Sequence, residues 1–322
     1  MSGGLLAWGV AVALFTAFLQ SLSYVLSRRF FASGGTPRQL LLTNCLLMAV
    51  PALFLLPELL PASNDGVTGT GLPHSLLPTA LWTAVAFVSG QFCWLLALRL
   101  TAGSVLASLY NLKIIAVGVG FSLYFHEHLT FPAAAGMVLA AAAAVLMGIF
   151  SGTGEKSVAG RRVDGIMPFR GVLALAASIA LLAGADVGIV ALIRDFSAAG
   201  CGYSRAAAAA GCLNVAVCGL IMLPALPAIK PKPRHFMLAV PYTAVCMLSI
   251  YTVNFAFSVL DPVYTNVLLS TRGLFSLLMG AVLAHFGFTA VEERAAGRRW
   301  LGRAAAALLM FAAIAVYSFG KI

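Results

Sequence analysis

Charged side chains are what this sequence has least of. Only 9% of its 322 residues are Asp, Glu, Lys or Arg, whereas 61% are hydrophobic. A soluble domain usually carries about 25% charged residues, so this chain has too few charges to cover a surface that faces water. Most of the exterior is therefore expected to face lipid, and the sequence predicts an all-α integral membrane protein.

Sequence motifs of polytopic membrane enzymes and of ATP-driven pumps are also missing. The five Asp residues form no DxxD pair for a magnesium diphosphate, and neither an HExxH zinc motif nor a GxSG-type serine motif occurs. There is no GxxxxGK[ST] loop for nucleotide phosphates. We therefore expect no enzymatic activity and no cofactor, with any transport driven by an ion gradient, by exchange or by the gradient of the solute itself.

Metal-binding patterns are weak. None of the six cysteines belongs to a CxxC pair, and most lie inside apolar runs, which is typical of packing residues. The run His126-Glu127-His128 lacks the spacing that places two histidines on one helix face. It is interpreted as a turn at the end of a helix, and no metal is expected.

The net charge of +10 does not indicate a nucleic-acid partner, because the bases lie in short connections between apolar runs and form no stripe interleaved with aromatic residues. What the sequence has in abundance is apolar runs of spanning length, about 20 residues each. In lipid, such runs must be helical to pair their backbone amides. We predict about ten spans, near residues 5–27, 39–57, 75–98, 103–125, 131–151, 171–193, 206–229, 235–258, 263–288 and 300–320.

The first run is read as a span and not as a cleavable signal peptide, because it lacks a basic flank before it and is as long as a full span. Fifteen Lys and Arg residues fall in the odd-numbered connections, and three in the even-numbered connections and the termini. The positive-inside rule then places both termini on the non-cytoplasmic side.

The two halves of the chain resemble each other. At a constant offset of 159 residues Lys113 aligns with Arg272, and at an offset of 166 Gln20 aligns with Asp186. We predict a first five-helix repeat at 1–151, a connecting loop at 152–170 and a second five-helix repeat at 171–322. An odd number of spans per repeat inverts the second repeat relative to the first, which is typical of secondary transporters.

Five plus five spans, with the runs 98–109 and 126–130 around the fourth, resemble the drug/metabolite transporter (DMT) superfamily of EamA type. In that family a Gly-Glu-x-Leu-like turn follows the fourth span. Glu127 and Leu129 match it, whereas His126 replaces the Gly and Phe286 stands where the second half would repeat the Glu. Many members also have a cytoplasmic N-terminus, in contrast to the orientation expected here.

Lys113 and Arg272 are the strongest candidates for a functional site, because a base at the centre of a membrane helix costs roughly 2.5–3.5 kcal/mol. The stretch 110–114 also resembles the fourth span of nucleotide-sugar transporters. In those and in triose-phosphate translocators, bases on spans four and nine face substrate phosphate, and that resemblance implies an organic anion as the cargo. Alternatively, either base pairs with Asp186 or extends toward an interface.

Asp186 with Gln20 is interpreted either as a proton or cation site or as the partner of one of the two bases. Aromatic and amide side chains in the spans are further candidates for a pocket that fixes a polar solute, with ordinary helix packing as the alternative. The full set of candidate substrate-binding residues is Lys113, Arg272, Tyr110, Asn111, Asp186, Gln20, Trp94, Tyr251, Asn254 and Asn266.

We therefore predict a secondary transporter that moves a small, anionic organic metabolite by alternating access. Export of neutral or cationic amino acids or drugs is the first alternative, and a non-transporting membrane scaffold is the second. The expected location is the plasma (inner) membrane. Membrane lipid and the small-molecule substrate are the expected partners, and a homodimer is left open.

Overall fold

The computed structural model describes residues 3–60, 76–100, 106, 109–126, 130–151, 169–231, 233–285 and 298–319. All regular structure in these ranges is helical. The first half contains α1 (Gly3–Ala32), α2 (Pro37–Leu59), α3 (Leu76–Leu100), the 3-10 turn η1 (Tyr110–Leu112), α5 (Lys113–Phe125) and α6 (Phe131–Ser151). The second half contains α7 (Phe169–Ala198), α8 (Tyr203–Met222), η2 (Leu223–Ala225), α9 (Leu226–Ile229), α10 (Pro233–Val259), α11 (Pro262–Leu269), α12 (Arg272–His285) and α13 (Arg298–Phe319).

Six helical segments of the described chain are long and apolar enough to cross a membrane: α1, α2, α3, α7, the α8–α9 segment and α10. The protein is thus an all-α, multi-pass integral membrane protein. The other four predicted spans are also mostly helical where they are described, apart from the bend at 270–271, but they are shorter, interrupted or partly outside the described residues. Most of the predicted connection 152–170 lies outside them as well.

Local sequence fixes where several helices begin. Thr36 caps α2 through a capping box with Gln39, and Pro37 occupies the first helical position, where its missing N–H costs nothing. Asp261 caps α11 by accepting hydrogen bonds from the N–H groups of Val263 and Tyr264. At the other end of α2, Arg205 donates hydrogen bonds to the carbonyls of residues 58, 59 and 60.

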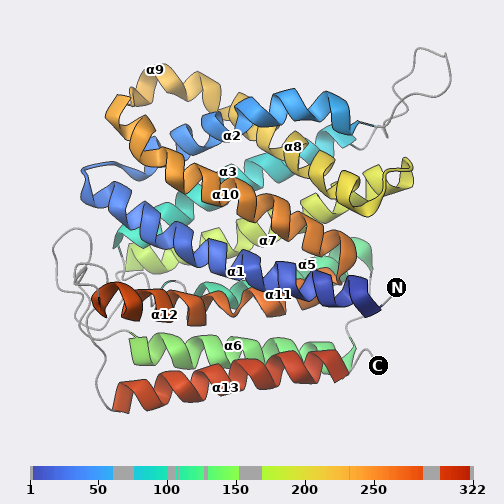
Figure 1. Cartoon of the computed structure of the whole chain (residues 1–322), viewed down its shortest axis with the longest axis vertical. Coiled ribbons are helices and arrows are strands. Elements are labelled where there is room, and N and C mark those ends of the chain that lie inside the picture. The colour runs from blue at the N-terminus through green and yellow to red at the C-terminus, as the bar shows by residue number, and fades with distance from the viewer. Residues whose placement is uncertain are drawn as a thin grey trace.

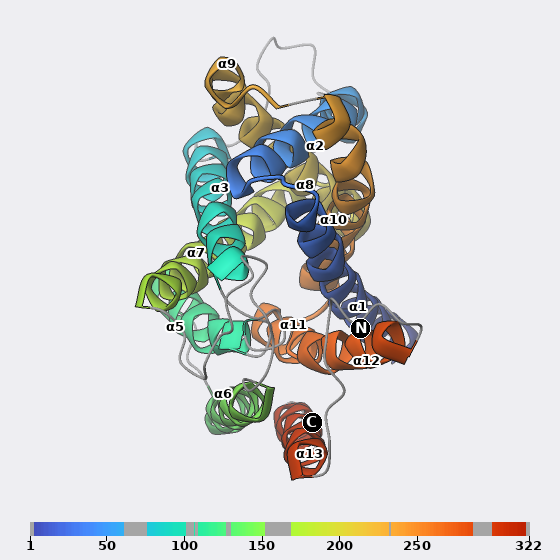
Figure 2. The ribbon, with the colours of Figure 1, turned by 90° about the vertical axis from the view of Figure 1, so that its left-hand side faces the viewer.

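The helices pack in pairs that join the two halves of the chain. α1 packs on α10, α3 on α7, α2 on α8 and α6 on α13. In Figure 2, α3, α7, α5 and α6 lie on one side of the molecule, and α10, α1, α12 and α13 lie on the other. Small residues permit the close approaches: a Cβ added to Gly219 of α8 would overlap Ala49 of α2.

The helices run broadly from one side of Figure 1 to the other, with α10 and α3 inclined in opposite directions. The beginning of α1 and the end of α13 lie at the same end of this bundle. Many large apolar side chains on the outer faces are exposed, including Trp8, Phe54 and Met237. Such an exterior suits hydrocarbon and not water.

Candidate functional site

Two basic residues begin the helices that follow a break in the fold. Lys113 is the first residue of α5 after the 3-10 turn η1, and Arg272 is the first residue of α12 after the bend at Ser270 and Thr271. The two breaks are joined directly, because Asn111 Nδ2 donates a 2.8 Å hydrogen bond to the Ser270 carbonyl. A helix N-terminus carries positive partial charge, so a base there adds to a region that already favours anions.

Arg272 is held by neutral groups only. Its Nε donates to Asn111 Oδ1 at 2.9 Å, its Nη1 to Gln20 Oε1 at 2.9 Å, and its Nη2 to the Tyr110 carbonyl at 3.4 Å. The side chain is only 5% exposed. No carboxylate of the described residues lies within ion-pair distance of it. Its positive charge is therefore fixed in place but not neutralised.

Lys113 has the opposite arrangement. Its Nζ lies 2.7 Å from Asp186 Oδ2, and the two side chains are 10% and 16% exposed. This pair realises one of the two interpretations left open for Asp186. The partners follow the sequence repeat, since Gln20 on α1 meets Arg272 and the aligned Asp186 on α7 meets Lys113.

A row of aromatic rings connects the bases to the rest of the site. The Arg272 guanidinium carbon lies 4.2 Å and Lys113 Nζ 5.7 Å from the centre of the Tyr110 ring. That ring lies 4.5 Å from Trp94, which in turn lies 5.1 Å from Tyr24, between ring centres. Cation–π attraction to Tyr110 stabilises both bases without neutralising either.

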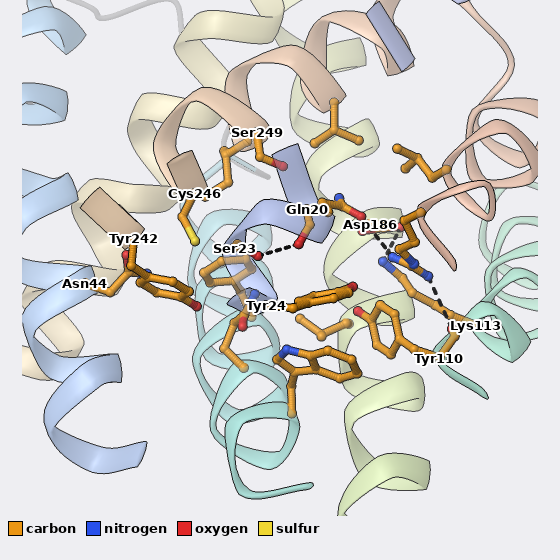
Figure 3. Close-up of a pocket in the computed structure, with 18 residues that line it drawn as sticks. Gln20, Ser23, Tyr24, Asn44, Tyr110, Lys113, Asp186, Tyr242, Cys246 and Ser249 are labelled. Carbon is orange, nitrogen blue, oxygen red and sulfur yellow. Dashed lines mark hydrogen bonds and ion pairs between the residues drawn. The ribbon is translucent and has the colours of Figure 1, made fainter. Parts of the chain in front are cut away.

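These groups line one cavity of about 120 Å³. Its walls come from both halves of the chain, and it is smaller than most small-molecule sites, which measure about 300–1,000 Å³. Figure 3 shows Lys113, Asp186 and Tyr110 at one end and Asn44, Tyr242 and Cys246 at the other. The Asn44 Oδ1 atom is buried without a hydrogen-bond partner among the described residues.

The cavity has a charged end and a neutral end. Of the described residues that line it, only Lys113, Asp186 and Arg272 carry a formal charge, and together they give a net charge of +1 when all are ionised. The neutral end offers hydroxyl, amide and thiol groups. This arrangement can attract one negative charge and form hydrogen bonds to the rest of a polar solute.

Six of the ten sequence-predicted residues line the cavity: Gln20, Trp94, Tyr110, Lys113, Asp186 and Arg272. Asn111 lies behind the wall and orients Arg272. The predicted residues Tyr251, Asn254 and Asn266 lie elsewhere.

Tyr251 contacts Cys212 at 3.1 Å and lines a second, largely apolar pocket between α2, α8 and α10. Asn254 is buried against Gly211, and Asn266 donates to the Pro262 carbonyl within its own helix. Asn266 thus has a role within its own helix, which agrees with the alternative of ordinary helix packing.

The sequence reasoning missed seven polar residues of the cavity wall. Helical spacing was a usable signal for three of them, because positions three or four apart share a helix face. Ser23 and Tyr24 follow Gln20 at that spacing, and Gln91 precedes Trp94 by three. The missed residues are Ser23, Tyr24, Asn44, Gln91, Tyr242, Cys246 and Ser249.

His126, which was considered and rejected as part of a metal site, ends α5 with a left-handed backbone at φ 54°. Glu127 and His128 lie outside the described residues. Within the described ranges, no cluster of three metal-ligating side chains occurs.

No protein-family model matches the chain, and no curated protein matches it in sequence. Chains of solved structures do match it in fold, 27 in all. One of them, a crystal structure described in no further detail, superposes with a TM-score of 0.61 at 17% sequence identity and covers 97% of this chain and 97% of its own. At that identity the likeness shows a shared fold over nearly the whole length and nothing about function.

Proposed function

We propose that this protein is a secondary transporter that moves a small anionic organic metabolite by alternating access, with ten spans in two inverted five-helix repeats, as in the DMT superfamily. The observation that carries the proposal is the cavity between the halves, where a buried, uncompensated Arg272 faces polar side chains from several helices. Intramembrane charge of this kind marks a solute pathway more often than a structural support.

Matching local geometry supports the repeat. α1 and α7 are both 30 residues long, and each is followed by a glycine at φ 88°, Gly34 and Gly200. The surrounding hydrogen bonds also correspond: Gly35 N–H donates to the Phe30 carbonyl, and Cys201 N–H to the Phe196 carbonyl. These pairs lie at the offset of 166 residues that relates the two halves in sequence.

The packing partners support it as well. By order along the chain, α1 corresponds to α7, α2 to α8, α3 to α10 and α6 to α13. Exchanging these counterparts turns the packing of α1 on α10 into that of α7 on α3, and it leaves the pairs α2–α8 and α6–α13 unchanged. Such a pattern is expected of two units related by a pseudo-two-fold axis. The beginning of α1 and the end of α13 lie at the same side of the bundle (Figure 1), which agrees with an even number of spans.

Alternating access needs a site at the interface of two units that rock against each other. The cavity meets this requirement, because Arg272 and Gln20 come from opposite halves, as do Lys113 and Asp186. Each base therefore bonds across the interface, and a solute that competes for these bonds loosens one half from the other. We place the protein in the plasma membrane with both termini outside the cytoplasm.

The test is a thermal-shift screen of the purified protein against metabolites, anionic compounds first, followed by flux of the stabilising compounds into proteoliposomes. The double variant Lys113→Gln, Arg272→Gln is expected to remain folded and to lose this flux. The matched control Arg170→Gln, Arg234→Gln changes two exposed bases at helix ends and should transport normally.

Full transport by the Lys113→Gln, Arg272→Gln variant would refute the anion site. Absence of flux for every compound that binds would favour a non-transporting scaffold. Stabilisation by neutral or cationic compounds alone would favour an exporter of such solutes.

A further inference from the structure

The two bases of the cavity have equivalent positions but unequal partners. Lys113 faces a carboxylate, Asp186, at 2.7 Å. Arg272 faces an amide, Gln20, at 2.9 Å in the aligned position. The two aligned contacts therefore have similar geometry but different charge. The cavity lining as a whole keeps one positive charge in excess.

Arg272 also keeps unused hydrogen-bonding capacity. A guanidinium has five N–H donors, and three of them have partners among the described residues: Asn111, Gln20 and the Tyr110 carbonyl. The Tyr24 hydroxyl also contacts the guanidinium, so one N–H group of a cation that is only 5% exposed is left for a ligand. An anionic oxygen acceptor satisfies both the charge and this donor, which neither water nor a neutral group does.

We infer that the cavity selects a solute with a single negative charge, and that the residues at positions 20 and 186 set this number. This inference rests on the proposed function and narrows its substrate class. A dianion would leave one negative charge unmatched in a buried site, and a neutral solute would leave Arg272 unmatched; both are costly. The rule makes the side chain at position 20 a specificity-determining group.

Single substitutions change the net charge of the cavity lining in both directions. Gln20→Glu places a carboxylate beside Arg272 and brings the lining to zero, and Asp186→Asn removes the carboxylate beside Lys113 and brings it to +2. The double variant Lys113→Met, Asp186→Asn removes an ion pair and keeps the count at +1. If the net charge of the lining decides which solute binds, this double variant keeps the wild-type preference for monoanions although two cavity residues have changed.

The experiment measures binding to purified protein by thermal shift and calorimetry, with sets of three compounds on one scaffold: a monocarboxylate, the corresponding dicarboxylate and a neutral methyl ester. Wild type is expected to bind monocarboxylates best. Gln20→Glu should weaken monocarboxylate binding by about 10-fold or more, and Asp186→Asn should raise dicarboxylate relative to monocarboxylate affinity by a similar factor. Gln39→Glu, the same change at the start of α2 where Glu also suits a capping box, should behave as wild type.

Several results would overturn the charge rule. They are a wild-type preference for dicarboxylates or esters, unchanged monocarboxylate binding by Gln20→Glu, loss of the preference in Lys113→Met, Asp186→Asn, or no binding of any monocarboxylate. If Asp186→Asn alone fails to fold, the double variant and Gln20→Glu still decide the question.

Failure of the rule and failure of the proposed function are distinguishable. Selective monocarboxylate binding without flux in proteoliposomes would keep the charge rule and refute transport. Flux of a dianionic or neutral solute would keep transport and refute the rule.

Discussion

Each half of this protein contributes one base to the cavity, and the two bases contact aligned residues of different charge. In one contact, a lysine meets an aspartate at 2.7 Å; in the other, an arginine meets a glutamine at 2.9 Å. The first contact is an ion pair without net charge. The second leaves a fixed positive charge exposed to the cavity, and that charge is available to a ligand.

The difference also concerns how firmly each base is held. The Arg272 side chain donates hydrogen bonds to three residues and its guanidinium carbon lies 4.2 Å from the Tyr110 ring centre, whereas Lys113 has one ion pair and its Nζ lies 5.7 Å from the same ring centre. A planar guanidinium suits a fixed anchor, while a flexible ammonium suits a contact that opens and closes. Under the proposed function, Arg272 is therefore the base that binds the anion and Lys113 is the contact that opens.

The largest expected effect is the loss of the anchor. Arg272→Gln should lower anion flux by up to about 100-fold, because a charge-assisted hydrogen bond to the solute is worth roughly 1.5–3 kcal/mol. Adding Asp186→Asn to this variant should recover part of the flux, since Lys113 then becomes the uncompensated base. Initial rates in proteoliposomes measure both, and a double variant as inactive as the single one would show that charge alone does not carry recognition.

A transfer of the carboxylate should have the next largest effect. Gln20→Glu alone is expected to weaken monocarboxylate binding by about 10-fold or more, whereas Gln20→Glu combined with Asp186→Gln moves the ion pair to Arg272 and frees Lys113. We expect the combined variant to recover most of this loss, since the net charge is restored. If it binds no better than Gln20→Glu, the halves are not interchangeable and the pseudo-symmetric description of the site is wrong.

The choice between arginine and lysine gives a smaller effect. Arg272→Lys cannot maintain bonds to Asn111, Gln20 and the Tyr110 carbonyl together, so flux should fall by roughly 10-fold even though the charge remains. Lys113→Arg keeps the ion pair with Asp186 and should cost less than Arg272→Lys. Equal losses measured as initial rates would remove the distinction between anchor and opening contact.

Much of this site could be predicted from the sequence. Lys113 and Arg272 stand out because a base inside an apolar run is costly, and the two sequence offsets align Lys113 with Arg272 and Gln20 with Asp186. The helical class and the approximate span limits followed from hydrophobic run lengths, as α2 at Pro37–Leu59 against the expected 39–57 illustrates.

Sequence alone did not decide which base Asp186 would meet. That depends on which helices pack together, here α5 on α7, and packing partners are not encoded in a single run of apolar residues. Tyr251 and Asn254 were chosen for their residue type, but they lie away from the cavity. Cys246 and Ser249 of the same helix line it, because the facing side of α10 is set by its contact with α1 and α2.

The smallest effects test whether the halves match in local geometry. Gly34 and Gly200 both have φ 88°, and among the described residues no atom beyond the chain neighbours lies within 4 Å of a Cβ added to either. Gly34→Ala and Gly200→Ala should therefore each cost only the strain of a left-handed backbone, roughly 1–2 kcal/mol. The control Gly202→Ala, at φ −64° with equally open surroundings, carries no such strain.

Apparent melting temperatures of the three glycine variants in one detergent provide the measurement. Both test variants are expected to fall by about 2–8 °C relative to wild type, and an Asn at either site should recover part of the loss because Asn tolerates the left-handed region better than Ala. Because the two turns share φ, hydrogen-bond pattern and free space, their losses should agree. A loss at one turn only would mean that the halves match in backbone path but differ in how much of the fold depends on each turn.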